Sequence, residues 1–324
     1  MESYVQRRIR VVSRAEKRQV KKKRKWPYWV GGIFLALVLL IGGFGFYVWN
    51  QVGATVETMH NPLARDKDPE RQKEVNNIFK ETESVNILLL GVDERSGDKG
   101  RSDTMILLSV NPNTESMIML SIPRDTYVNI PGRGMDKINH AYAFGGTELS
   151  VQTVEETFDL PIHAYARVNM EGFQQGVDAL GGVTVTNDFA FTQDGRTYPE
   201  GQITLNGEEA LSYIRMRYED PRGDMGRNER QRKVITAAMN EAASFNSITK
   251  IGEFLNILGG NVQTNLDMDK IQTLVTGYAG ARKNVTTMEI NGSGQTIGGV
   301  WYYNVPESEF NRITTEITNH MEAN

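Results

Sequence analysis

Residues 85–110 read VNILLLGVDERSGDKGRSDTMILLSV, two apolar runs joined by a polar loop that contains glycine. We predict that both runs are strands, so that Asp93 follows the end of the first and Asp103 lies at the start of the second. Functional groups of α/β proteins gather at strand ends, where loops converge on a ligand. Two aspartates without a neighbouring histidine or cysteine suit a hard cation such as Mg²⁺, shared with phosphate oxygens. A solvated polar turn is the alternative interpretation.

Beyond this loop, short hydrophobic segments alternate with helical patterns. The runs at 105–110 and 117–122 flank Asn-Pro-Asn-Thr, a turn sequence, and predict a hairpin. Further strands are expected at 164–170, 183–186, 286–290 and 300–303, and helices at 147–158, 171–180, 206–213, 226–244, 247–256, 268–279 and from Pro306 onward. The glycine-rich stretch 291–299 is expected to be a loop. Strands alternating with helices predict a mixed α/β sandwich, a central sheet flanked by helices.

The N-terminal region differs sharply from the rest of the chain. Residues 1–25 hold 11 lysines and arginines against two glutamates, a net charge of +9, whereas the remainder carries −13. No charged residue occurs in 26–56, and roughly 20 apolar residues are enough to span a bilayer. We therefore predict a basic tail at 1–25 and one transmembrane helix, a signal anchor, at 26–49. A cleaved signal peptide is the alternative, although its apolar region would be only about 7–15 residues long.

The basic tail also predicts the orientation, because cations flank the cytoplasmic side of a span. The protein is then a single-pass protein of the cell membrane with its N-terminus in the cytoplasm. Residues 50–83 are expected to form an extracytoplasmic stalk, followed by an extracytoplasmic catalytic domain at 84–324 whose motifs lie within 84–244. Orientation and attraction to anionic lipid explain the basic tail better than nucleic-acid binding does. Since the chain has no cysteine, disulfides and thiol catalysis are excluded.

Common catalytic signatures are missing from this sequence. It contains no P-loop, no Gly-x-Gly-x-x-Gly between a strand and a helix, and no Gly-x-Ser-x-Gly, and its four histidines lack zinc spacing. Cationic residues after predicted strands therefore become the main candidates. Pro123 ends a predicted strand and exposes Arg124 at its end, and Lys137 precedes a helical run. Each cation could equally be an ordinary surface residue.

Two arginines follow a predicted helix that starts with a capping box from Asn206 to Glu209. Arg215 and Arg217 are two residues apart, with apolar residues between and before them. In a continued helix they would point about 200° apart, whereas in an extended segment they share a face. The alternation favours two guanidiniums aimed together, and paired guanidiniums match phosphate oxygens bidentately.

The next predicted helix opens at Asp224 and carries Arg227 and Gln231 on a stripe that continues through Val234 and Ile235. The polar pair therefore extends the buried face of this helix. Buried arginine is costly unless a counter-charge meets it, and a helix N-terminus is a natural anion site. A salt-bridged helix start capped by Asp224 is the alternative interpretation.

In order along residues 84–244, the chain contains LLGVD, RSD, SIPRD, DKINHA, NGEEALSYIRMR and DMGRNERQ. This set, with the short basic tail and single anchor, closely resembles the LytR-CpsA-Psr family. The resemblance implies a membrane-anchored phosphotransferase of the Gram-positive cell envelope. Such enzymes move a glycopolymer, commonly wall teichoic acid or capsular polysaccharide, from a polyprenyl diphosphate carrier to peptidoglycan. A cytoplasmic DNA-binding role would need a larger domain than the 25-residue tail.

The resemblance also implies roles for individual residues. Asp93 and Asp103 would hold Mg²⁺ or Mn²⁺, and the lipid tail would lie in an apolar tunnel between sheet and helices. The diphosphate would be bound by Arg101, Arg124, Lys137, Arg215, Arg217, Arg227 and Gln231. The catalytic set would be Asp93, Arg101, Asp103 and Asp224, the last either acting on the attacking hydroxyl or only capping its helix. A lipid-diphosphate-binding regulatory protein and a polyprenyl-diphosphate pyrophosphatase would use the same groups.

Overall fold

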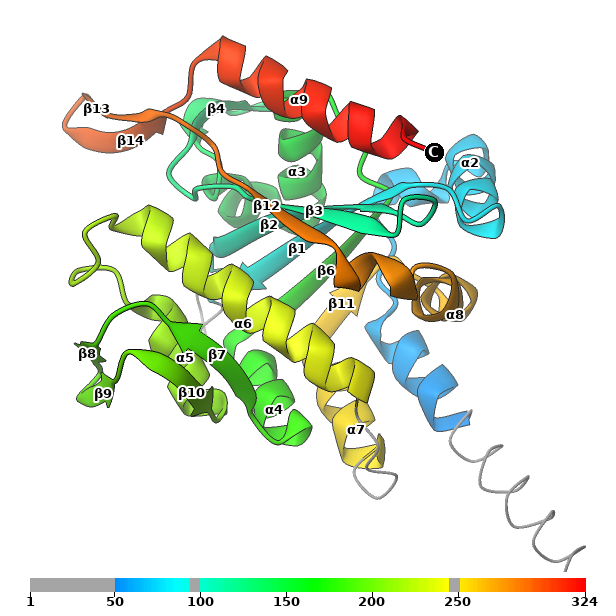
Figure 1. Ribbon diagram of the computed structural model, residues 1–324. Coiled ribbons are helices and arrows are strands. Elements are labelled where there is room, and N and C mark those ends of the chain that lie inside the picture. Colours follow the sequence, from blue (N-terminus) through cyan, green and yellow to red (C-terminus); the bar gives the residue numbers. More distant parts are fainter. Residues whose placement is uncertain (1–49, 94–99, 245–250) are drawn as a thin grey trace, which may run out of the picture. The chain divides into compact units, whose positions relative to one another are not determined.

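The computed structural model describes residues 50–93, 100–244 and 251–324 (Figure 1). These residues all belong to one compact unit, Val48–Asn324. The predicted basic tail (1–25) and membrane anchor (26–49) lie outside the described residues. In the part of the chain that is described, no helix is both long and apolar enough to cross a bilayer.

A six-stranded mixed sheet lies at the centre, with the strand order β11-β6-β1-β2-β3-β12. Its strands are β1 (Val85–Val92), β2 (Ser102–Asn111), β3 (Ser116–Ser121), β6 (Ala164–Asn169), β11 (Val262–Thr264) and β12 (Val285–Met288). β2 pairs antiparallel with both β1 and β3, which confirms the predicted hairpin. β6 runs parallel to β1, and β12 parallel to β3. The carboxyl ends of β1 and β6 therefore meet at one edge of the sheet.

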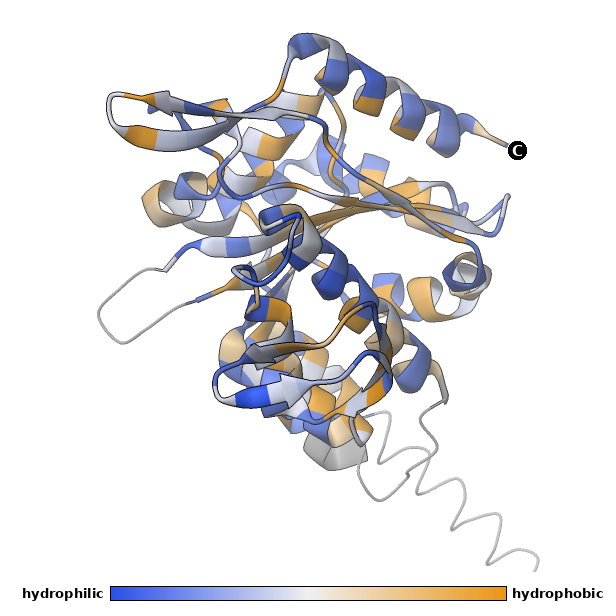
Figure 2. Ribbon diagram, turned by 60° about the vertical axis from the view of Figure 1, so that its left-hand side comes forward, coloured by the Kyte–Doolittle hydropathy of each residue, from blue (hydrophilic) through white to orange (hydrophobic). Residues whose placement is uncertain are grey.

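Helices cover both faces of the sheet, which confirms the predicted α/β sandwich (Figure 1). One face packs against α3 (His140–Phe158) and α9 (Glu307–Glu322), and the other against α2 (Pro69–Lys80), α6 (Asp224–Ser244) and α8 (Met268–Gly277). Because strand side chains alternate, Leu88 and Leu90 enter the first core, whereas Val85 and Ile87 enter the second. Figure 2 shows the resulting apolar strands between helices of mixed polarity.

A smaller lobe follows β6 in the chain. It contains α4 (Met170–Leu180), β7 (Val183–Asn187), β8 (Phe191–Gln193), β9 (Arg196–Tyr198), β10 (Gly201–Leu205) and α5 (Gly207–Arg215). Its core includes the neighbouring rings of Phe191, Tyr198 and Tyr213. α6 joins the lobe to the sheet, because Val234 packs in the lobe core and Ile235 packs against the sheet core.

Two further hairpins flank the sheet, and one of them includes residues that were expected to form a loop. They are β4 (Tyr127–Ile130) with β5 (Gly134–Lys137), and β13 (Ser293–Ile297) with β14 (Val300–Asn304). Further helices are η1 (Ala64–Lys67), α7 (Ile251–Asn261) and η3 (Ala279–Lys283), and residues 50–59 are also helical. The prediction of a loop at 291–299 was wrong. Only Gly298 and Gly299 form a turn, with φ of 57° and 83°, values that glycine adopts without strain.

Residues 50–83, expected as a stalk, pack closely on the rest of the unit. Val56, Met59 and Leu63 are buried, and so is Phe79 of α2. The hydroxyl of Tyr165 in β6 donates a hydrogen bond to the carbonyl of Asn61. The segment looked detached because its few apolar residues are widely spaced among charges, yet Leu63 packs into one core of the sheet and Val75 and Phe79 into the other.

Candidate active site

Asp93 and Asp103 lie beside the carboxyl end of β1. Val92 pairs with Ser102 and Gly91 with Thr104, so Asp103 is the extra residue of a β-bulge. Bulges often redirect a side chain beside an active site. Asp93 and Asp103 both line a pocket of about 230 Å³. We refer to this cavity as the charged pocket.

Arginines from three separate elements line the charged pocket. Arg124 follows β3, Arg215 and Arg217 lie at the end of α5, and Arg227 occupies the first turn of α6. α5 begins with the predicted capping box, in which Asn206 and Glu209 bond each other's backbone N–H. The helix ends at Arg215, and Met216 is extended, with φ of −59° and ψ of 134°. This change of backbone direction brings both arginines to one pocket.

Side chains of alternating charge form a row of ion pairs from Asp103 to Lys137. Arg124 Nη1 lies 2.8 Å from Asp103 Oδ1, and its Nε lies 3.6 Å from Asp125 Oδ2. Lys137 Nζ is 2.6 Å from the other oxygen of Asp125. Burial opposes the charge on Arg124, but the carboxylates of Asp103 and Asp125 outweigh it, so the pKa of Arg124 is raised. Lys137 thus contacts the pocket only through Asp125 and Arg124.

Arg227 is the most deeply buried arginine of the charged pocket, with 7% of its surface exposed. Its Nη2 lies 2.8 Å from Asp224, yet burial still lowers the pKa of Arg227. Among the described residues, Arg227 Nε has no hydrogen-bond partner. A buried guanidinium with an unused donor beside a pocket suits an anionic ligand.

Not every candidate from the sequence lines this pocket. Arg101 is exposed at the start of β2, and its backbone carbonyl accepts a hydrogen bond from Asp93 N. Asp224 faces Arg227 rather than the pocket wall. The sequence analysis missed Tyr218, which lines the pocket, is 87% exposed and lies under the Arg217 guanidinium, 4.7 Å from its ring centre. No sequence pattern distinguished this tyrosine from a surface residue.

A buried ion pair holds the arginine-bearing segment in place. Arg230 Nη1 lies 2.6 Å from Asp220, and its Nη2 donates to the carbonyl of Met216 at 2.6 Å. A side chain on Gly226 would place Cβ 1.8 Å from the Asp220 carboxylate, so only glycine permits this approach. Arg230 therefore positions Arg215 and Arg217 without facing the pocket, a role that its motif alone did not reveal.

An apolar cavity of about 150 Å³ adjoins the charged pocket, and the two share four lining residues, Thr104, Met170, Ile214 and Gln231. Its other walls include Leu90 of β1, Val168 of β6, Phe173 of α4 and Ile235 of α6. Gln231 and Ile235 lie one turn apart, as the helical stripe predicted. The combined space has a cationic mouth and a hydrocarbon-lined interior, which suits an amphiphile with an anionic head group.

The two aspartates fit a Mg²⁺ ion that shares its coordination with phosphate. Asp93 and Asp103 are half-buried and line a pocket that also holds four arginines. Nowhere in the described ranges do three or more acidic or histidine side chains cluster so as to hold a metal. An ion here would take its remaining ligands from phosphate oxygens and water, which is the usual arrangement for Mg²⁺.

Comparison with known proteins assigns the family. A family model described as the LytR_cpsA_psr family matches residues 46–319. The chain belongs to the LytR-CpsA-Psr family. A protein of Oceanobacillus iheyensis, the polyisoprenyl-teichoic acid–peptidoglycan teichoic acid transferase TagU, is 69% identical over 318 residues, which cover 96% of this chain and 99% of that protein.

Two solved structures are similar to this chain in both fold and sequence. The crystal structure of Bacillus subtilis TagU has a TM-score of 0.61 and 44% identity, over 75% of this chain and 98% of that one. TagT bound to LIIa-WTA has a TM-score of 0.68 and 32% identity, over 81% of this chain and 99% of that one. The mixed α/β domain with a central sheet is therefore shared with these relatives.

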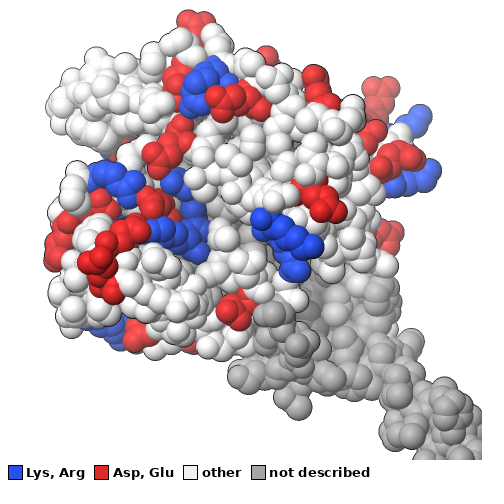
Figure 3. Space-filling view, in the orientation of Figure 1, with Lys and Arg blue, Asp and Glu red and all other residues white. Residues whose placement is uncertain are grey.

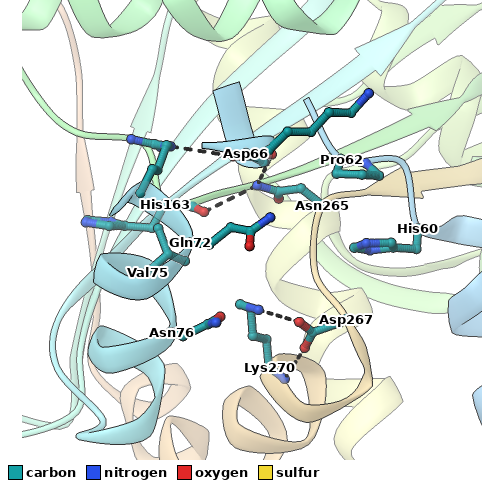
Figure 4. A pocket seen from close by; sticks show the side chains of 12 residues that line it. His60, Pro62, Asp66, Gln72, Val75, Asn76, His163, Asn265, Asp267 and Lys270 are labelled. Atoms are coloured by element: carbon teal, nitrogen blue, oxygen red, sulfur yellow. Dashed lines mark hydrogen bonds and ion pairs between the residues drawn. The ribbon is translucent and has the colours of Figure 1, made fainter. Parts of the chain in front are cut away.

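This LytR-CpsA-Psr protein also contains a polar pocket of about 270 Å³ at the amino ends of β1 and β6 (Figure 4). There, Asn265 donates hydrogen bonds to Asp66 and to the carbonyl of His163, at 3.0 and 3.4 Å. Lys270 pairs with Asp267. Arg71 also lies 3.5 Å from Asp66, so two of the pocket's cations pair with its own carboxylates, and none of the six family motifs contributes to it.

His163 in this polar pocket should make stability depend on pH. Burial, with the nearby Arg71 and Arg65, lowers the pKa of His163 to about 4. The unfolded chain, with a histidine pKa of about 6.5, binds a proton that the folded protein excludes between these values. Stability is therefore complete above about pH 6.5 and declines as the pH falls toward 4.

We expect His163 to lower the free energy of unfolding by about 2 kcal/mol between about pH 7.5 and pH 5. Urea unfolding of the wild type and of His163→Gln at both pH values measures this difference. The variant should lose less stability than the wild type over the same interval. An identical pH dependence in the two proteins would show that His163 is not the group responsible.

Proposed function

We propose that this protein transfers wall teichoic acid, or a similar anionic glycopolymer, from a polyprenyl diphosphate carrier to peptidoglycan during cell wall biogenesis. The observation that carries the proposal is the junction of the charged pocket with the apolar cavity. A diphosphate head group matches the four arginines, and a polyprenyl chain matches the apolar walls. Two relatives add support: one carries the name teichoic acid transferase, and TagT was solved with LIIa-WTA bound.

The chemistry follows from the bonds that must change. A peptidoglycan hydroxyl attacks the phosphorus next to the glycan, forms a phosphodiester and expels polyprenyl phosphate, while the hydroxyl proton passes to solvent. Arg124, Arg215 and Arg227 would bind the diphosphate oxygens and neutralise the charge that develops on them. Asp93 and Asp103 would hold Mg²⁺ or Mn²⁺, which supplies further positive charge at the same oxygens. No nucleotide is consumed, because the cleaved diphosphate bond drives the transfer.

We assign indirect roles to the candidates that do not line the pocket. Asp224 would orient Arg227 through their ion pair, and Lys137 would orient Arg124 through Asp125. Arg101 would act from the loop next to Asp93, to which its carbonyl is hydrogen-bonded. Gln231, which lines both cavities, would contact the head group where it joins the lipid.

A transfer assay tests the proposed function. Purified full-length protein would be mixed with Mg²⁺, a labelled polyprenyl diphosphate glycopolymer and peptidoglycan oligomers. We expect the label to move to peptidoglycan while polyprenyl phosphate is released in equal amount. Release of phosphorylated glycan to water alone would identify a pyrophosphatase instead. Tight binding of the donor without any product would identify a lipid-binding or regulatory protein.

The membrane topology is a separate prediction that rests on the basic tail and the uncharged stretch after it. We expect an alkaline phosphatase reporter fused after Asn324 to be active, because the catalytic domain lies outside the cytoplasm. A matched fusion after residue 25, before the span, should be inactive. Activity in the second fusion and none in the first would reverse the orientation.

A further inference from the structure

A groove of about 440 Å³ shares no lining residue with the charged pocket and is not explained by donor binding. Its walls include Tyr127, Asn129 and Met135 from the β4–β5 hairpin, Asn304 and Glu307 from the start of α9 and the strand before it, and Glu156 and Thr157 from the end of α3. It is lined by the aromatic rings of Tyr127 and Phe310, two amides, a threonine hydroxyl and two carboxylates, besides apolar side chains. We refer to it as the lateral groove.

The lateral groove connects to the charged pocket through Lys137. Lys137 pairs across the hairpin with Tyr127, so the two side chains share a face. Its ammonium lies 5.7 Å from the ring centre of Tyr302, which in turn lies 4.8 Å from the ring of Tyr127. Since Lys137 also pairs with Asp125, which lies 3.6 Å from Arg124, a chain of side-chain contacts links Arg124 to Tyr127 in the groove wall.

The β13–β14 hairpin is fixed to the segment that carries Arg124. Tyr303 N donates a hydrogen bond to the carbonyl of Asp125 at 2.8 Å, and Tyr303 forms a bridge with Thr126. Asn304 lines the groove, and Tyr302, two residues before it on β14, shares its face and packs on the ring of Tyr127 in the groove wall. Trp301 lies on the opposite face of the strand and is 46% exposed. Figure 3 shows that the surface of this hairpin is uncharged.

We propose that the lateral groove binds the acceptor, an uncharged stretch of peptidoglycan glycan, and delivers its hydroxyl to the charged pocket. This inference rests on the proposed function, which needs two substrates, whereas the charged pocket and apolar cavity account for one. The apolar faces of sugar rings stack on tyrosine rings, and their hydroxyl and acetamido groups bond to amides and carboxylates. Within the described ranges, the side-chain amides of Asn129 and Asn304 have no other hydrogen-bond partner.

The charge of the lateral groove decides which substrate occupies it. Glu156 and Glu307 are exposed carboxylates in its wall. They would repel the phosphates of an anionic donor polymer, because like charges at close range raise the free energy of the complex. An acceptor sugar without phosphate meets no such penalty. The donor polymer therefore leaves the charged pocket by another route, and the groove remains for the acceptor.

Kinetics of full-length protein in detergent test the groove. In Tyr302→Ala, the KM for peptidoglycan oligomers should rise roughly tenfold, the loss expected for one well-placed aromatic contact. The KM for the lipid-linked donor should stay unchanged. Trp301→Ala is the matched control, since it removes the neighbouring ring from the other face, and its acceptor KM should equal that of the wild type. If both variants raise the acceptor KM equally, the groove assignment is wrong.

A direct binding measurement separates this inference from the proposed function. N-acetylchitotetraose would be titrated into the full-length wild type, Tyr302→Ala and Asn304→Ala, with thermal melting as a check of folding. Asn304→Ala removes a partly exposed amide, so it tests the groove even if Tyr302→Ala does not fold. Weaker binding in the folded variants supports the groove even if no transfer occurs. Equal binding in all three proteins overturns it, whether or not the protein is a transferase.

Discussion

Asp103→Ala should reduce glycopolymer transfer roughly a hundred- to a thousandfold, as the loss of a group that organises charge at a reacting phosphate does. Two consequences combine in this variant. One proposed metal ligand disappears, and Arg124 loses the carboxylate that lies 2.8 Å from its Nη1. Asp93→Ala removes the other proposed ligand and should show a loss of similar size. In both variants, added Mg²⁺ should restore little activity.

Folding should be nearly unaffected, because both aspartates are half-exposed at the edge of the sheet. We expect melting temperatures close to that of the wild type. Asp188→Ala serves as the control, since Asp188 is an exposed carboxylate, outside the charged pocket, that pairs with Lys233 at the surface. Binding of Mn²⁺, followed by electron paramagnetic resonance, should weaken in the Asp93 and Asp103 variants alone. Full specific activity in either of them would mean that these carboxylates are structural.

Local patterns in the sequence were enough to predict the elements that build the site. Alternating and continuous apolar runs located β1, β2 and β3, and the capping box at Asn206 located the start of α5. The stripe through Arg227 and Gln231 predicted which face of α6 is buried. Each of these signals depends on residues within one or two turns of each other, which is the range over which helix and strand periodicity acts.

Contacts between distant segments could not be predicted in this way. Nothing near Asp103 indicates that it occupies a bulge, because the bulge exists only relative to β1. The ion pair of Arg230 with Asp220 joins residues on two sides of a turn, and a charged side chain there looks solvated in the sequence. The glycines at 291–299 suggested a loop, yet pairing with β14 makes Ser293–Ile297 a strand. The packing of 50–83 likewise depends on the sheet.

The other large effect is expected on the lipid that accompanies the protein. A polyprenyl diphosphate pairs a multiply charged head with a long hydrocarbon chain, and the charged pocket and apolar cavity meet at Gln231. We therefore expect protein purified from bacterial membranes to retain polyprenyl phosphate or diphosphate. Arg227→Ala and Arg215→Ala should each weaken head-group binding by roughly 1.5–3 kcal/mol, about ten- to over a hundredfold. Mass spectrometry of extracted lipid measures the retained amount.

Three features make this comparison decisive. Arg227 is buried, so its loss also leaves Asp224 without its partner, and a stability change must be checked by thermal melting. Arg215 is exposed, so its removal changes head-group binding without touching the core. Arg222 provides the control, because it has a half-exposed side chain that pairs with Glu229 rather than lining the pocket. Equal lipid retention in all three variants would show that Arg215 and Arg227 do not hold the head group. The lipid would then bind at another site, because removing either guanidinium from the charged pocket would have had no effect.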